Sequence, residues 1–328
     1  MDELVRLEKL TKSFPQKRKQ DVVILRDIDL TIKEGETLCV LGESGCGKTT
    51  LGKILAGLSS YSSGSYQFCG EEVRTLRKEN WDFFRNHVQM IHQNPYESLN
   101  PAMMVFDMIA NPIRRHKHIN DIPTLYKKVT DLLELVGLTP VEDFVDKYPN
   151  ALSGGQRQRV SIARILAMDP KLIVVDEATS MIDTSLRISL LKTLVDIQTK
   201  LNVSYFFITH DLALGRYFAR GQKAMIMYLG RIVEESPADE LISKAAHPYT
   251  RAILSAASGS SEILQHSAGH YELLEADVPS FTALPSGCVL HPRCPQRIAG
   301  LCDCIQPERY EVSPGHFVSC HLYAKDRA

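Results

Sequence analysis

The residues with the clearest chemistry form a glycine-rich loop near the start of the chain. Gly42 to Thr49 reads GESGCGKT and fits the pattern G-x-x-x-x-G-K-[ST]. In such a loop the backbone N–H groups turn inward onto phosphate oxygens, and the following helix N-terminus adds partial positive charge. We therefore expect Lys48 to reach the β- and γ-phosphates of a nucleotide and the Thr49 hydroxyl to bind Mg²⁺. The phosphate-binding residues predicted here are Gly42, Ser44, Gly45, Cys46, Gly47, Lys48, Thr49 and Thr50, with Cys46 as a small filler rather than a catalytic group.

Two adjacent acids follow an apolar run farther along the chain. The segment Leu172 to Glu177 reads LIVVDE, so a buried strand should deliver Asp176 and Glu177 beside the phosphates. We expect Asp176 to hold Mg²⁺ through water and Glu177 to act as the general base on the attacking water. Solvated acids at an ordinary strand end are the alternative, which the phosphate loop disfavours.

A third motif indicates which family of nucleotide-binding proteins the chain resembles. Leu152 to Gln156 reads LSGGQ and is followed by Arg157-Gln158-Arg159, about twenty residues before Asp176. With this motif the chain resembles the ABC ATPases. The backbone after Ser153 lies at a predicted helix N-terminus, which is an anion site. The resemblance implies that Ser153, Gly154, Gly155 and Gln156 bind the γ-phosphate of ATP held by a second ATPase subunit, so that each site is completed by two chains.

The other elements of that family are present in order. Gln93 resembles the glutamine that contacts Mg²⁺ and the attacking water, and His210 resembles the histidine on the γ-phosphate; a strand-end histidine without a task is its alternative. Residues Ser180 to Asp183 resemble the D-loop, although Ala-Leu is commoner than their Met-Ile. Phe14 is the candidate for stacking on adenine, with a core or surface role equally open. Ala178 replaces the usual proline of the importer branch, a change common in other ABC ATPases.

Three further segments indicate a branch of the family. Asn94 to Pro101, His247 to Thr250 and Gly287 to Pro295 resemble the ATPases of dipeptide and oligopeptide importers. The resemblance implies ATP hydrolysis that powers peptide import. A nickel or metallophore importer is the alternative, because these relatives share the first segment. A soluble ABC protein without a transport role is disfavoured, because the chain has one ATPase unit and no long coiled coil.

The eight cysteines are unevenly placed. Five lie in the last part of the chain, and the resemblance implies a [4Fe–4S] cluster on Cys288, Cys294, Cys302 and Cys320. Four thiolates also suit zinc, although no C-x-x-C pair is present. Cys304 is an extra thiol. Small buried cysteines without a metal are the remaining alternative.

The composition fits a protein that works away from nucleic acid. The 328 residues include 38 basic and 39 acidic ones, so the chain lacks the basic excess of a nucleic-acid binder. No apolar run is long enough to span a bilayer, and the N-terminus does not resemble a signal peptide. We expect a peripheral protein at the cytoplasmic face of the membrane. The family implies three kinds of partner: a related second ATPase subunit, two transmembrane permease subunits and, through them, an extracellular substrate-binding protein.

The elements that must position these motifs can be read from local patterns. We expect strands at 37–41, 172–175 and 205–208, and helices from about Lys48, over 154–168 and over 185–201, with 103–150 largely helical. Alternating strands and helices predict an α/β fold with a mostly parallel core sheet, an N-terminal antiparallel region and a helical subdomain over about 94–153. The predicted domains are a nucleotide-binding domain over 1–255 and a linker with a small Cys-rich C-terminal extension over 256–328.

Overall fold

The computed structural model describes residues 2–16, 21–93, 99–177, 184–258 and 271–324, and its strands form two sheets. The smaller sheet is antiparallel and has the order β2-β1-β4-β5. Its strands are β1 (Glu3–Phe14), β2 (Val22–Lys33), β4 (Ser63–Phe68) and β5 (Glu71–Glu72). The expected N-terminal antiparallel region is therefore present.

The larger sheet has the order β11-β12-β10-β9-β3-β8-β7-β6. Strands β9, β3, β8, β7 and β6 run parallel, and β10, β12 and β11 are added in antiparallel fashion. The parallel strands are β3 (Thr37–Leu41), β6 (Val88–Ile91), β7 (Leu172–Asp176), β8 (Ser204–Ile208) and β9 (Lys223–Tyr228). The antiparallel ones are β10 (Arg231–Pro237), β11 (Tyr310–Ser313) and β12 (His316–Val318). The mixed α/β class with a mostly parallel core sheet is confirmed.

The parallel strands are buried on both faces, which explains their continuous apolar sequences. On β3, Leu38 and Val40 pack into the core shared with the N-terminal sheet, whereas Cys39 and Leu41 pack into the core on the opposite face. Helix α1 (Lys48–Leu55) lies in the first core and contacts β7, β8 and β2. Gly52 allows this close packing, because a Cβ there would lie 2.8 Å from the Ile208 side chain.

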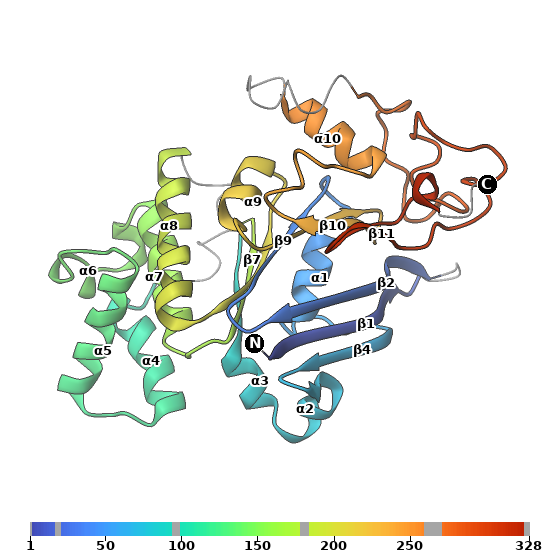
Figure 1. The fold of residues 1–328 in the computed structure, drawn as a ribbon. Coiled ribbons are helices and arrows are strands. Elements are labelled where there is room, and N and C mark those ends of the chain that lie inside the picture. Colours follow the sequence, from blue (N-terminus) through green and yellow to red (C-terminus); the bar gives the residue numbers. More distant parts are fainter. Residues whose placement is uncertain (1, 17–20, 94–98, 178–183, 259–270, 325–328) are drawn as a thin grey trace.

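The helices form separate groups around the sheets (Figure 1). Near the N-terminal sheet lie α2 (Val73–Glu79) and α3 (Trp81–His87). A larger group contains α4 (Val105–Lys117), α5 (Ile122–Leu135), α6 (Glu142–Val145), the 3-10 turn η2 (Pro149–Ala151), α7 (Gly154–Leu166) and α8 (Thr184–Leu201). The region expected to be largely helical is thus divided by turns, one at Asp121, which caps α5, and one at Gly137, whose φ is 75°. The predicted domain boundaries stay a prediction.

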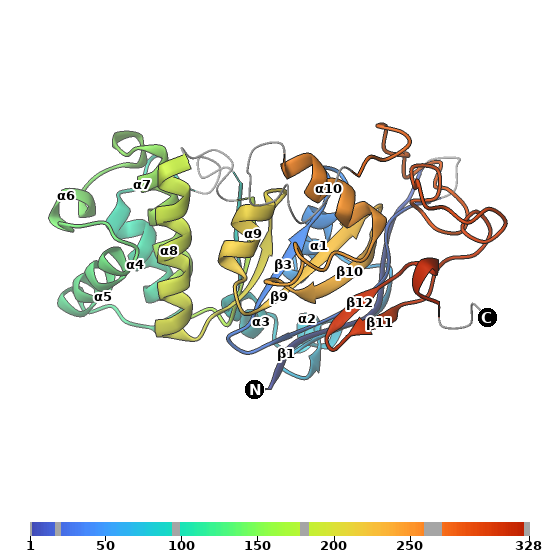
Figure 2. The same ribbon diagram turned by 45° about the horizontal axis from the view of Figure 1, so that its top comes forward.

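The C-terminal segment joins the main sheet rather than forming a body of its own. Helix α10 (Pro248–Ser258) lies near β10, and strand β12 pairs with β10 through Glu234 and Val318 (Figure 2). The short η3 (His321–Tyr323) and α9 (Leu212–Phe218) complete the described elements. A separate Cys-rich extension is therefore not confirmed. Among the described helices, none combines the length and apolar character that a bilayer span requires.

Candidate functional site

The glycine-rich loop connects the end of β3 to the start of α1, as expected. Gly42, Gly45 and Gly47 have φ values of 151°, 80° and 111°, which side chains with a Cβ rarely adopt. Gly42 also passes close to its neighbours, because a Cβ there would lie 2.2 Å from the Met227 carbonyl oxygen. The loop leaves Ser44, Gly45 and Thr49 exposed, Thr50 half-buried and Cys46 buried. This exposed turn at a helix N-terminus is suited to phosphate.

Lys48 lies beneath the loop and is buried. Its Nζ donates to the carbonyl oxygens of Gly42 at 2.7 Å and of Glu43 at 2.9 Å. The ammonium group therefore sits at the loop's first turn, where its positive charge is available to a phosphate that enters the loop.

Asp176 meets the loop from the end of β7. The Thr49 hydroxyl donates to Asp176 Oδ1 at 3.1 Å. Burial raises the pKa of the Asp176 carboxyl, the hydrogen bond from Thr49 opposes this shift, and the nearby Glu177 adds to it. A hydroxyl beside a buried carboxylate is an oxygen donor set of the kind Mg²⁺ prefers, so these residues fit that ion.

Glu177 stands at the centre of a second polar group. Gln93, just after β6, donates from Nε2 to Glu177 Oε2 at 3.3 Å, and His210, just after β8, places Nδ1 3.2 Å from Glu177 Oε1. The Glu177 backbone has a φ of 45°, which costs energy in a residue with a Cβ, and its N–H donates to Ile208 O at 3.1 Å. Parallel strands thus bring together side chains from distant parts of the sequence at one edge of the sheet.

The signature residues lie elsewhere in the molecule. Ser153 caps α7 and forms a capping box with Gln156, with N–H···O distances of 3.3 Å and 2.9 Å. Helix α7 packs on α4, α5, α8 and β6, and Figure 1 shows it to one side of the molecule, away from α1. A Cβ on Gly154 would meet nothing within 4 Å, so the backbone there is accessible. One chain therefore presents the loop and the signature at separate places.

The remaining predicted site residues are placed less centrally. Phe14 is 43% exposed at the end of β1, and the Lys12 ammonium lies 4.6 Å from its ring centroid. The segment 94–98, which carries most of the proposed Gln93 loop extension, lies outside the described residues. The same holds for 178–183, which include Ala178 and the proposed D-loop.

Two contacts on the loop were not anticipated from the sequence. The Glu43 N–H donates to Tyr249 Oη at 2.9 Å, and the Glu43 carboxylate pairs with Arg293. Both partners lie in segments quoted above for their resemblance to importer ATPases, His247 to Thr250 and Gly287 to Pro295. These two motifs were the available sequence signal for Tyr249 and Arg293, although neither motif indicates that its residue contacts the phosphate loop.

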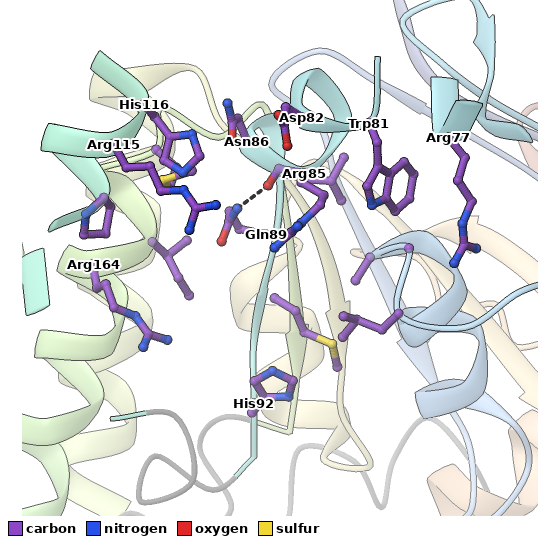
Figure 3. A pocket seen from close by; sticks show the side chains of 18 residues that line it. Arg77, Trp81, Asp82, Arg85, Asn86, Gln89, His92, Arg115, His116 and Arg164 are labelled. Carbon is purple, nitrogen blue, oxygen red and sulfur yellow. Dashed lines mark hydrogen bonds between the residues drawn. The ribbon is translucent and has the colours of Figure 1, made fainter. Parts of the chain in front are cut away.

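A groove of about 560 Å³ separates the α2–α3 region from α4 and α7 (Figure 3). Three exposed arginines line it, Arg77 of α2, Arg85 of α3 and Arg115 of α4. Arg164 of α7 faces it as well, and Asp82 is the acidic residue of the lining. Gln89 and His92, on and just after β6, form its floor close to Gln93. This groove is therefore positively charged and lies next to the Glu177 group.

The prediction of an iron–sulfur cluster is wrong, and the zinc alternative fails with it. The described residues contain no group of three or more His, Cys, Asp or Glu side chains that could hold a metal ion. Cys288, Cys294, Cys302 and Cys320 are instead buried in apolar clusters. Burial raises the pKa of Cys288 to about 11 and of Cys320 to about 12, so both thiols are protonated at neutral pH.

Comparisons with known proteins agree with this geometry. Residues 25–180 match the family model described as ABC transporter, and residues 233–302 match the model described as oligopeptide/dipeptide transporter, C-terminal region. The oligopeptide transport ATP-binding protein AppF of Bacillus subtilis is 35% identical over 98% of this chain and 98% of its own length. OppF of Escherichia coli, which bears the same description, is 38% identical over 89% and 86%. Neither name specifies an iron–sulfur cluster.

A solved structure with a similar fold contains a bound nucleotide. The ATP-binding cassette MJ0796, in a dimeric post-hydrolysis state bound to ADP and Pi, is 25% identical, has a TM-score of 0.63, and covers 72% of this chain and 99% of its own. The full-length identity to the oligopeptide relatives, the two family models and the loop geometry lead to one conclusion. The chain belongs to the family of ABC transporter ATP-binding proteins and is an ABC-type ATPase.

Proposed function

We propose that this chain powers the import of dipeptides or oligopeptides through an ABC transporter at the cytoplasmic face of the membrane. The observation that carries the proposal is the match of residues 233–302 to the C-terminal region of oligopeptide/dipeptide transporters, together with full-length relatives named for oligopeptide transport. The loop at Lys48 and the Glu177 group supply the ATP chemistry that such a motor needs.

In the proposed site, Lys48 and the loop N–H groups bind the phosphates of ATP. Thr49, Asp176 and Gln93 hold Mg²⁺, which supplies charge neutralisation on the phosphate oxygens. Glu177 accepts a proton from the attacking water, and His210 contacts the γ-phosphate. Phe14 stacks on adenine. Phosphoryl transfer depends mainly on positioning and charge stabilisation, so these residues act chiefly by preorganisation.

The signature residues act on a second chain in this proposal. Ser153 is exposed at the start of α7, and a Cβ on Gly154 would meet nothing within 4 Å, so Ser153 and the backbone of Gly154 and Gly155 are suited to ATP held by a partner. Two ATPase subunits arranged head-to-tail would complete both sites at once. The dimeric state of the MJ0796 cassette supports such an assembly. A related but distinct second subunit is the partner that the family implies.

The basic groove is the proposed docking site for the permeases. It lies between the sheet and the helical group, and its floor residues border Gln93, so a bound segment would sense the nucleotide site. The exposed guanidinium groups of Arg77, Arg85 and Arg115 favour a cytoplasmic permease segment with acidic side chains. Two transmembrane subunits, and through them an extracellular substrate-binding protein, complete the proposed transporter.

Uptake measurements test the cargo. Cells that carry Lys48→Ala in place of the natural chain should lose uptake of a labelled dipeptide or oligopeptide while keeping nickel uptake. Loss of nickel uptake with intact peptide uptake would overturn the proposal and favour the metal-importing alternative. Intact uptake of both would argue against an importer role altogether.

A further inference from the structure

Arg293 and Glu43 join the C-terminal region to the phosphate loop. The two residues are 250 positions apart in the sequence, yet the guanidinium and the carboxylate meet in a forked pair. Arg293 Nη1 lies 3.1 Å from Glu43 Oε2, and Nη2 lies 3.3 Å from Oε1. Paired forks of this kind fix orientation as well as charge.

Further hydrogen bonds fix the guanidinium group of Arg293 in the position where it pairs with Glu43. Nε donates to Glu275 O at 3.0 Å, Nη2 donates also to Ala276 O at 3.0 Å, and Nη1 donates also to Tyr228 Oη at 3.2 Å. The five N–H donors of the guanidinium thus have five acceptors. The side chain is 3% exposed, so the charge is shielded from bulk water.

The backbone and the side chain of Glu43 are also held by specific contacts. Its N–H donates to Tyr249 Oη, its carbonyl oxygen accepts from Lys48 Nζ, and its carboxylate faces Arg293. The residue therefore touches the phosphate-binding lysine on one side and the C-terminal region on the other. Its carboxylate adds a negative charge to a loop that, in the proposed site, receives the phosphates of ATP.

Electrostatics gives the pair a role. An unpaired carboxylate at Glu43 would repel ATP, and the repulsion would be weakly screened because the group is partly buried. Resting on the proposed ATP site at Lys48, we propose that Arg293 is a positioning residue for ATP binding: it neutralises the Glu43 carboxylate and thereby keeps the phosphate loop attractive to ATP. The C-terminal region thus contributes to the nucleotide site without touching the nucleotide.

The alternative is a purely structural role, in which the pair of Arg293 with Glu43 only holds the C-terminal region against the core. Arg309 provides the matched comparison, because its Nη2 pairs with Glu235 Oε2 at 2.5 Å and ties the same region to β10 away from the loop. Loss of either pair should lower the thermal unfolding midpoint. Only loss of the Arg293 pair should change ATP binding.

The test is MgATP affinity of the full-length chain, measured by titration calorimetry alongside the unfolding midpoint. Arg293→Met should raise the Kd for MgATP about tenfold, which corresponds to about 1.4 kcal/mol. Arg293→Lys keeps the charge and should stay within about threefold of the natural chain, and Arg309→Met should not change the Kd. The double variant Arg293→Met with Glu43→Gln removes the carboxylate and should recover most of the lost affinity.

Each result decides the matter. An unchanged Kd for Arg293→Met overturns the proposal, and so does a double variant that binds as weakly as Arg293→Met, since a purely structural tie would not be rescued. If Arg293→Met does not fold, Glu43→Gln alone decides, because charge neutralisation predicts tighter MgATP binding and a structural clamp predicts weaker binding. Lys48→Ala distinguishes a failure of the proposed ATP site from a failure of the proposed role of Arg293. Undiminished MgATP binding by that variant would overturn the ATP site itself.

Discussion

The Nδ1 atom of His210 lies 3.2 Å from Oε1 of Glu177, although the two residues follow different strands of the main sheet. Gln93 approaches the other carboxylate oxygen at 3.3 Å, so Glu177 is contacted from both sides. A carboxylate held this way, at a backbone φ of 45°, has a fixed direction before any substrate arrives. That fixed direction is what a general base for a bound water requires.

Glu177→Gln should abolish most hydrolysis while leaving ATP binding intact. The amide occupies the same volume but cannot take a proton from water, so we expect kcat to fall about 10²- to 10⁴-fold. The assay is phosphate release by the assembled transporter, with MgATP affinity of the variant measured separately. Asp211→Asn is a matched control, because Asp211 caps α9 and asparagine caps equally well. Undiminished hydrolysis by Glu177→Gln would disprove the assigned role.

Gly42 should be far less tolerant of alanine than Gly45. Both have positive φ, which costs alanine about 1 kcal/mol, but a Cβ on Gly45 meets nothing within 4 Å. A Cβ on Gly42 would lie 2.2 Å from the Met227 carbonyl oxygen, so the backbone of β9 would have to move. We expect Gly42→Ala to cost about 3 kcal/mol or more in the free energy of unfolding. Equal costs in denaturant titrations would contradict the packing argument.

The sequence predicts the local parts of this site well. The loop ending at Thr49 and the acids at Asp176 and Glu177 are specified by short motifs on buried strands, so their elements and their shared sheet edge follow from periodicity. Gln93 and His210 were identified by resemblance, and the structure brings both to Glu177.

Long-range contacts could not be predicted in the same way. The pairing of Arg293 with Glu43 depends on how the C-terminal region folds back, and the pairing of β12 with β10 adds that region to the main sheet. Neither has a local signature. The cysteine prediction failed for a related reason, because spacing alone did not reveal that these thiols are buried in apolar clusters.

The arginines of the groove should matter for transport. Arg115→Glu reverses a charge that is exposed on the groove wall, so it should weaken docking of an acidic permease segment and lower peptide uptake several-fold. Arg6→Glu is the control, because Arg6 is exposed on β1 and pairs with Glu3 and Glu8 outside the groove. The Kd for MgATP of each purified variant is measured alongside, so that an effect on ATP binding would be recognised. Full uptake with Arg115→Glu would argue against docking at this groove.

His247 should make the fold sensitive to mild acid. The ring is 1% exposed, and its Nδ1 accepts a hydrogen bond from the Tyr249 N–H at 3.1 Å, which requires the neutral form. Burial lowers the pKa of His247 from 6.5 to about 4, the Glu234 charge opposes this shift, and Arg251 adds to it. At a pH between about 4 and 6.5, His247 binds a proton in the unfolded chain but not in the folded chain. Stability from this group is therefore complete above about pH 6.5 and declines as the pH falls toward 4.

The loss at pH 4 should reach about 3 kcal/mol, because a difference of one pKa unit corresponds to about 1.4 kcal/mol. His247→Asn keeps a side-chain acceptor for the Tyr249 N–H and cannot titrate, so its unfolding free energy should depend less steeply on pH over this window. His118→Asn is the control, because His118 is exposed and has a φ of 54°, a conformation that asparagine tolerates. Denaturant titrations at a series of pH values give the comparison. Equal slopes for His247→Asn and the natural chain would assign the acid sensitivity to other groups, such as the buried Glu234.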